Sequence, residues 1–105
     1  MPRVKVRYFG RLRELLNVKE EEHTVKAGAS IADLLLKYIP EKHKEVSEAW
    51  RETIFRTVKG EMLLRKDGTP LIRNYLVLMN GKSPNLGCIL KEGDEVAVLP
   101  PFGGG

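Results

Sequence analysis

The sequence lacks several features that mark common classes of protein. Cys88 is its only cysteine, so the chain cannot form an internal disulfide. No apolar run is long enough to span a bilayer, and Arg3, Lys5 and Arg7 interrupt the first apolar stretch, where a signal peptide would need continuous apolar residues. The sequence therefore predicts a cytoplasmic protein that does not bind a membrane.

Recognisable catalytic and metal-binding motifs are also missing. There is no G-x-x-x-x-G-K-[ST] phosphate loop and no other glycine-rich loop between a strand and a helix. His23 and His43 lack metal-ligand spacing, so we expect both to be solvated and no metal to be bound. Cys88 has no histidine near it in the sequence and is expected to be a small buried residue. The chain is expected to have neither a catalytic site of its own nor a tightly bound cofactor.

Charge of one sign is not concentrated in the sequence. The net charge is +4, from 18 basic and 14 acidic residues that are interspersed. Nucleic-acid binding usually needs a clustered basic face, so nucleic acid is not an expected partner. Arg3, Lys5 and Arg7 could form a stripe for RNA, but the solvated face of a sheet explains them more simply.

The 105 residues suit one compact domain, which begins with a strand hairpin. Between Arg3 and Phe9, charged residues alternate with Val4, Val6 and Tyr8, and this period of two is typical of a half-buried strand. A second strand is expected around residues 21–25. Gly10 to Val18 turns the chain between the two strands.

The clearest predicted helix follows this hairpin. Ser30 is a good helix N-cap, and Asp33 places an acid in the first turn. The apolar residues that recur at spacings of three and four are Ile31, Leu34, Leu35, Tyr38 and Ile39. Pro40 lacks an N–H and disfavours the helical conformation of Ile39, so the helix is expected to end there.

Residues 41–73 are predicted to form a helical and irregular insert. An apolar pattern through Trp50 indicates a second helix that Gly60 would end. Trp50 and Phe55 are expected to pack this insert onto the domain. Short strand candidates follow at residues 62–65 and 71–73.

Two further strands complete the predicted sheet. Residues 75–79 are almost wholly apolar and run into the turn Asn80-Gly81, which indicates a central strand. Residues 95–99 form the last strand, and the long connection allows it to lie parallel to the first. The order of elements predicts an α+β roll, with a mixed sheet of four to five strands and a helix on one face.

The end of the chain is the most informative segment. We expect a domain over residues 1–99 and a flexible tail over residues 100–105. Pro100 and Pro101 stop sheet pairing and hold the chain extended. The six tail residues would then reach roughly 20 Å beyond the sheet. Terminal glycines are sometimes only loose ends, but here they follow a strand, two prolines and Phe102.

Glycine at the end of a tail suits chemistry at the main-chain carboxylate. A narrow channel in a partner enzyme can hold residues without a Cβ, so Gly103, Gly104 and Gly105 would pass through it. Phe102 is expected to anchor the tail in a partner groove. A carboxylate is a poor electrophile and must first become an acyl-adenylate. Because the chain has no nucleotide motif, another protein must use the ATP.

Both ends of the sequence resemble one family. The stretch GDEVAVLPPFGGG (residues 93–105) resembles the C-terminal signature of the molybdopterin synthase small subunit, a ubiquitin-like sulfur carrier. The stretch VKVRYFGRLREL (residues 4–15) resembles the first strand of that family and the segment after it. The capped helix and the Asn80-Gly81 turn occur in matching order. The resemblance implies a β-grasp (ubiquitin-like) fold.

The resemblance also implies a reaction cycle and its partners. An adenylating enzyme of the ubiquitin-activating type would form an acyl-adenylate on Gly105, and a sulfur donor would convert it to a thiocarboxylate. The carrier would then dock on the large subunit of molybdopterin synthase and donate its sulfur to the pterin precursor. Gly104 and Gly105 match the family's reactive end, with Pro100, Pro101, Phe102 and Gly103 as partner-binding residues.

Other functions share this fold and this tail. Proteins related to the family that this sequence resembles include ubiquitin-like modifiers, which are conjugated to lysines of target proteins. Others are sulfur carriers for tRNA thiolation or thiazole synthesis. A binding module with an inert tail is a further alternative. Fold alone does not decide between them.

Overall fold

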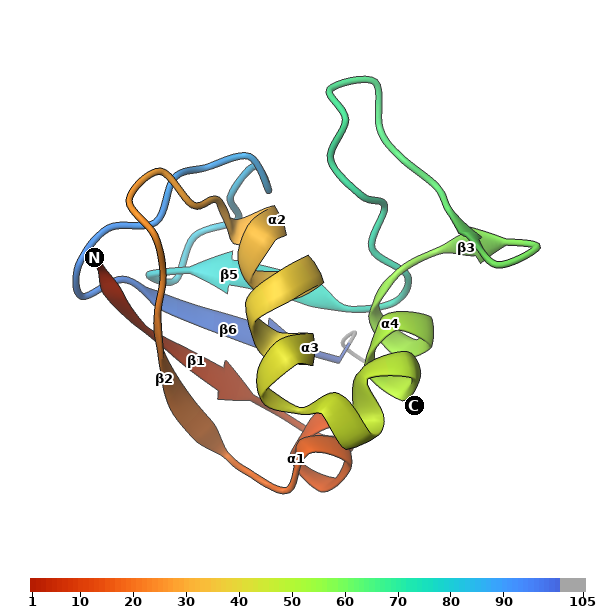
Figure 1. The fold of residues 1–105 in the computed structure, drawn as a ribbon, viewed down its shortest axis with the longest axis horizontal. Coiled ribbons are helices and arrows are strands. Elements are labelled where there is room, and N and C mark those ends of the chain that lie inside the picture. The colour runs from red at the N-terminus through yellow and green to blue at the C-terminus, as the bar shows by residue number, and fades with distance from the viewer. Residues whose placement is uncertain (101–105) are drawn as a thin grey trace.

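The computed structural model describes residues 1–100 and contains a four-stranded sheet in the order β2-β1-β6-β5 (Figure 1). The strands are β1 (Arg3–Tyr8), β2 (Glu20–Thr24), β5 (Leu76–Met79) and β6 (Glu95–Leu99). β1 pairs antiparallel with β2 and parallel with β6, and β6 pairs antiparallel with β5. The predicted parallel pairing of the first and last strands is confirmed.

The two central strands follow the alternation in their sequences. Val4, Val6 and Tyr8 of β1 are buried, whereas Arg3 and Arg7 lie on the opposite, exposed face. In β6, the buried side chains are those of Val96 and Val98. In the parallel register, Val6 lies opposite Val96 and Tyr8 opposite Val98. The buried face of the sheet is therefore continuous across the two strands.

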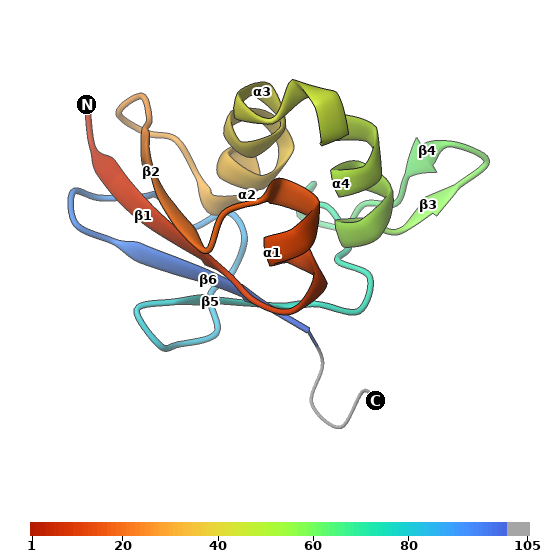
Figure 2. The same ribbon diagram turned by 90° about the horizontal axis from the view of Figure 1, so that it is seen from below.

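Helices cover that buried face (Figure 2). Short helix α1 (Arg11–Leu16) follows β1 and buries Leu12 and Leu16. The main helix is continuous through α2 (Ile31–Asp33), η1 (Leu34–Tyr38) and α3 (Ile39–Lys42). At its start, the Ser30 hydroxyl accepts a hydrogen bond from the Asp33 N–H at 3.1 Å, and the Asp33 carboxylate accepts one from the Ser30 N–H at 2.9 Å. The predicted N-terminal cap is confirmed.

The prediction that this helix ends at Pro40 is wrong. Segment η1 is a π-helical turn, in which the Ile39 N–H donates to the Leu34 carbonyl. In that register the missing N–H of Pro40 leaves the Leu35 carbonyl without a helical donor. The indole N–H of Trp50 donates to this carbonyl at 2.9 Å. The insert thus supplies the hydrogen bond that the proline cannot, and the helix continues to Lys42.

The insert contains η2 (Lys44–Val46), α4 (Ser47–Ile54) and the two-stranded hairpin of β3 (Thr57–Val58) and β4 (Glu61–Met62). Helix α4 ends at Ile54, so the prediction that Gly60 ends it is wrong. Lys59 and Gly60 have φ values of 53° and 82° and form the turn of the hairpin.

The core that the insert shares with the sheet is apolar. Trp50, Ile54 and Phe55 have at most 1% of their surface exposed. The Trp50 ring packs edge-on against Tyr8 of β1, with 6.1 Å between the ring centroids. The prediction that Trp50 and Phe55 pack the insert onto the domain is confirmed.

Strand β5 lies at an edge of the sheet, and the expectation of a central strand is wrong. Its apolar sequence reflects contact with the core through Val77, whereas Leu76 is 41% exposed. The central place belongs to β6, because β6 pairs with β1 on one side and β5 on the other.

The architecture is that of a β-grasp fold, with a hairpin, a helix crossing the sheet and a last strand that returns beside the first. Among residues 1–100, no helix has the length and apolar character needed to cross a membrane.

Candidate functional site

The predicted reactive tail is described only at its root. Pro101, Phe102, Gly103, Gly104 and Gly105 lie outside the described residues 1–100. Their roles, and the boundary between a domain and a tail, stay predictions. The root consists of β6 and the exposed Pro100 that follows it.

The root is held on both sides by the sheet. Leu99, the last residue of β6, lies opposite Leu76 of β5, and Val98 lies opposite Tyr8 of β1. Val96 and Val98 are fully buried. The chain therefore leaves the domain from a central strand whose direction is fixed by two neighbours.

Gly10 contributes to the root from the other end of the chain. Its backbone has φ 63° and ψ −135°, a conformation that only glycine adopts easily. A Cβ at this position would lie 3.3 Å from Cγ of Pro100. Glycine thus permits both the turn into α1 and the close approach of Pro100. The sequence offered one signal for this contact, because Gly10 lies within the N-terminal stretch that resembles the family.

Two hollows are lined by residues of the root or of the segments next to Gly10 and Leu76, which contact it. One of about 310 Å³ lies on the exposed face of the sheet. Its lining residues are Arg7, Phe9, Leu78, Asn80, Gly81, Glu95, Ala97 and Leu99. The other, of about 420 Å³, is lined by Arg11, Leu12, Glu14, Leu15, Thr53 and Tyr75. These surfaces could receive a partner's side chains beside the emerging chain.

The charges on the sheet face pair with one another. Arg7 lies 3.6 Å from Glu20 and 3.3 Å from Glu95, and Lys5 lies 3.4 Å from Glu20. These pairs are half-exposed, so each contributes little to stability. Their acidic members do, however, neutralise most of the positive charge of the stripe formed by Arg3, Lys5 and Arg7. The stripe is therefore a solvated sheet face, as expected, whose basic side chains are paired with acidic ones.

A buried polar cluster lies on the buried side of the hairpin of β1 and β2 and was not foreseen. The Glu21 carboxylate accepts a hydrogen bond from the Tyr8 hydroxyl at 2.6 Å. It also lies 2.9 Å from Nε2 of both His23 and His43. Lys42 Nζ lies 3.8 Å away. The expectation that His23 and His43 are solvated is wrong, because their side chains are only 5% and 16% exposed.

Hydrogen bonding determines the charge of Glu21 in this cluster. Burial alone would favour neutral Glu21, but hydrogen bonds from His23, Tyr8 and His43 outweigh it and lower the pKa of Glu21 to about 2. Burial, reinforced by Glu21, raises the pKa of Tyr8 far above its ordinary value. Glu21 is therefore a carboxylate at neutral pH, and each histidine must donate to it from Nε2. The cluster ties β1, β2 and the end of α3 together.

The remaining candidates are also located. Cys88 is exposed, so its predicted burial is wrong. The neighbouring leucines, Leu86 and Leu90, occupy the buried positions instead. Within residues 1–100, no group of three or more histidine, cysteine or acidic side chains could hold a metal ion.

Comparison with known proteins identifies the family. The family model described as the ThiS family matches residues 6–105. The chain belongs to the ThiS family. Its similarity to individual members extends over nearly the whole length, insert included.

Three relatives illustrate this similarity. The chain is 28% identical over 102 residues to the molybdopterin synthase sulfur carrier subunit of Chlamydomonas reinhardtii, covering 97% of this chain and 98% of that protein. The structure of a putative molybdopterin converting factor, subunit 1, from Pyrococcus furiosus superimposes with a TM-score of 0.69 at 32% identity, covering 97% of this chain and all of that one. The structure of small archaeal modifier protein 1 from Methanosarcina acetivorans superimposes with a TM-score of 0.69 at 28% identity, covering 100% of this chain and 98% of that one.

Proposed function

We propose that the chain is a ubiquitin-like sulfur carrier for molybdopterin biosynthesis, with Gly105 as its reactive residue. Membership of the ThiS family supports a carrier role, and the names of the Chlamydomonas and Pyrococcus relatives point to molybdopterin. The observation that carries the proposal is that a triple-glycine end follows, after two prolines and a phenylalanine, from the central strand β6.

The first chemical step takes place on a partner enzyme. A Gly105 carboxylate oxygen attacks the α-phosphate of Mg-ATP, pyrophosphate leaves, and an acyl-adenylate forms. A hydrosulfide-equivalent nucleophile from a sulfur donor then attacks the carbonyl carbon, and AMP leaves with the electrons of the C–O bond. The product is a thiocarboxylate on Gly105. In this scheme ATP is a substrate of the activating enzyme.

The second step is delivery. The carrier docks on a protein of the molybdopterin synthase large-subunit type, and the tail places the thiocarboxylate at the pterin precursor. Pro100 and Pro101 direct the tail, while Phe102 and Gly103 contact the partner. Ordering three glycines costs on the order of 3–6 kcal/mol, which contacts of the folded surface must offset. The hollow lined by Leu99 and the hollow lined by Arg11 and Tyr75 are suited to such contacts.

Intact mass spectrometry of the protein from its native cells tests this proposal. We expect a fraction of the chains to end at Gly105 and to carry one sulfur in place of one oxygen, assigned to Gly105 by fragmentation. A mature chain that extends past Gly105, or a tail that never gains sulfur while the pathway is active, would contradict it.

A protein modifier is the second candidate, favoured by the similarity to small archaeal modifier protein 1. It shares the adenylation step, but a target lysine amine displaces the activated group and forms an isopeptide bond. The same native-cell sample separates the two functions. Branched lysine peptides that bear the glycine tail indicate a modifier, and a sulfur-bearing free tail indicates a carrier.

A further inference from the structure

Residues 55–72 form an arm that projects from the core, to which Phe55, Met62 and Ile72 join it (Figure 1). It consists of the β3–β4 hairpin and a return segment beside it. The Arg56 N–H donates to the Leu71 carbonyl, and the Leu71 N–H donates to the Leu63 carbonyl, both at 3.0 Å. Isolated bridges join Phe55 to Ile72 and Leu64 to Pro70. The arm therefore has a defined backbone pairing.

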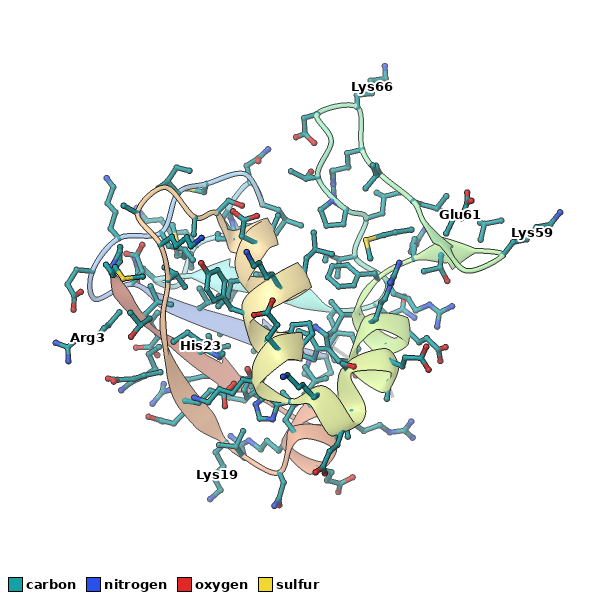
Figure 3. The ribbon with its side chains drawn as sticks, in the orientation of Figure 1. Arg3, Lys19, His23, Lys59, Glu61 and Lys66 are labelled. Atoms are coloured by element: carbon teal, nitrogen blue, oxygen red, sulfur yellow. The ribbon has the colours of Figure 1, made fainter. Side chains whose placement is uncertain are left out.

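The net charge of the arm is positive. Its basic residues are Arg56, Lys59, Arg65 and Lys66, and its acidic residues are Glu61 and Asp67. All four basic residues are exposed, and Lys59 and Lys66 project outward at the tips of two turns (Figure 3). Among residues 1–100, none of the four forms an ion pair, whereas Arg3, Lys5 and Arg7 of the sheet all do. Asp67 accepts hydrogen bonds from Thr69 and Asn85, and these bonds, together with the nearby charge of Arg65, lower the pKa of its carboxyl.

Apolar side chains accompany these charges. Val58 and Leu64 of the arm are 53% and 58% exposed, and Leu63 is 36% exposed. A groove of about 470 Å³ lies at the base of the arm, next to the helices. Its lining residues are Leu36, Pro40, Ser47, Glu48, Trp50, Arg51, Phe55 and Met62. Exposed aliphatic side chains among unpaired cations suit a partly apolar, acidic protein surface.

RNA fits these features less well. Single-stranded RNA is held largely by stacking of its bases on exposed aromatic side chains. Phe55 is the one aromatic residue of the arm, and it is 1% exposed. The exposed surface of the arm therefore offers aliphatic contacts and charge, but no stacking platform.

The arm also begins close to the root of the tail. Ile72, at the base of the arm, is four residues before Leu76, so their Cα atoms are at most roughly 14 Å apart. Leu76 pairs with Leu99, directly before Pro100. A protein that holds the tail is thus within reach of the arm.

We propose that the arm is a second docking element, which binds an acidic, partly apolar surface on the enzyme that holds the tail. This inference rests on the proposed function. It adds that part of the affinity comes from a surface remote from the reactive glycine. The arm would select the partner, while the tail undergoes the chemistry.

Isothermal titration calorimetry with a charge-reversed variant of the arm tests the proposal. The double variant R65E/K66E of the full chain is titrated against the purified activating enzyme and against the purified large subunit, both from the same organism. We expect its affinity for at least one of them to fall about 10-fold or more at low salt, and the difference to narrow at high salt. Leu64→Ser should weaken the same complex with little dependence on salt.

The matched control reverses the charge of two exposed lysines outside the arm. Lys19 and Lys26 form no ion pair within the described residues and lie outside the arm, so K19E/K26E should change affinity by less than about twofold. Wild-type affinity of R65E/K66E for both enzymes would overturn the arm proposal and leave the proposed function intact. Loss of affinity for a 20-nucleotide RNA alone would also overturn it. If the unaltered chain bound neither enzyme, both proposals would fall.

Discussion

Individual residues at the end of the chain carry the proposed chemistry, and Gly104 provides the sharpest test. A methyl group at this position should obstruct the channel that holds the tail. We expect Gly104→Ala to abolish transfer of AMP to the chain while leaving the melting temperature unchanged, because the buried apolar residues found among residues 1–100 all lie between Val4 and Val98. Radiolabelled adenylation and circular dichroism measure the two effects. The control is Ser83→Ala in an exposed loop, and unimpaired adenylation of the Gly104 variant would refute the threading mechanism.

Glu21 gives a prediction for pH dependence. Its pKa is lowered from 4.5 to about 2 in the folded protein, so the folded state favours the carboxylate. The resulting stability is fully present above about pH 4.5 and is lost as the pH falls through about 2. We expect the free energy of unfolding to decline less steeply over this window in Glu21→Gln than in the unaltered chain. Urea unfolding at a series of pH values measures it.

The neighbouring residue serves as the control for this experiment. Glu22 is exposed, so Glu22→Gln should keep the steep decline of the unaltered protein. Identical pH profiles for the Glu21 variant and the unaltered protein would show that the cluster does not hold a charged carboxylate.

At the scale of elements, the main helix depends on one buried face. Leu35 is fully buried, whereas the adjacent Leu36 is 39% exposed. Leu35→Ala should cost about 2–5 kcal/mol of stability through lost burial and a residual cavity, and Leu36→Ala well under that. Chemical denaturation of the two variants compares them directly. Equal effects would mean that the helix faces the sheet differently.

The elements that the sequence predicted correctly are those with local signals. The alternation in β1 and the N-cap at Ser30 depend on residues only a few positions apart, and both are confirmed. The helix past Pro40 could not be predicted, because the compensating hydrogen bond comes from Trp50, 15 residues after Leu35. Gly60 is ambiguous in the sequence, because the left-handed conformation that ends a helix also forms the turn of a hairpin.

The candidate site likewise has one part that the sequence predicts and one part that it does not. The tail was recognisable because its residues are consecutive. The Glu21 cluster was not, since His43 lies 22 residues from Glu21 and meets it only through packing of α3 on β2. Likewise, an apolar strand such as β5 does not reveal its place in the sheet. The place of β5 depends on long-range pairing, because β6 lies between β1 and β5 and so leaves β5 at the edge.

At the scale of the whole molecule, stability should differ between the sheet and the arm. β1 and β6 are the central strands and contribute fully buried side chains, whereas the arm has few. Amide hydrogens bonded between β1 and β6 should exchange with solvent only on global unfolding. Those of Leu63 and Arg65 in the arm should exchange through local opening, at least about 10-fold faster. Exchange measured by NMR distinguishes the two, and uniform protection would contradict this division.

The central position of β6 has a mechanical consequence. An enzyme that pulls on the tail applies force along the axis of β6, and the ladders to β1 and β5 oppose it in shear on both sides. Many hydrogen bonds must then break together, whereas a strand peeled from an edge loses them one at a time. A carrier that is repeatedly threaded into and withdrawn from its partners would thereby keep its fold under load.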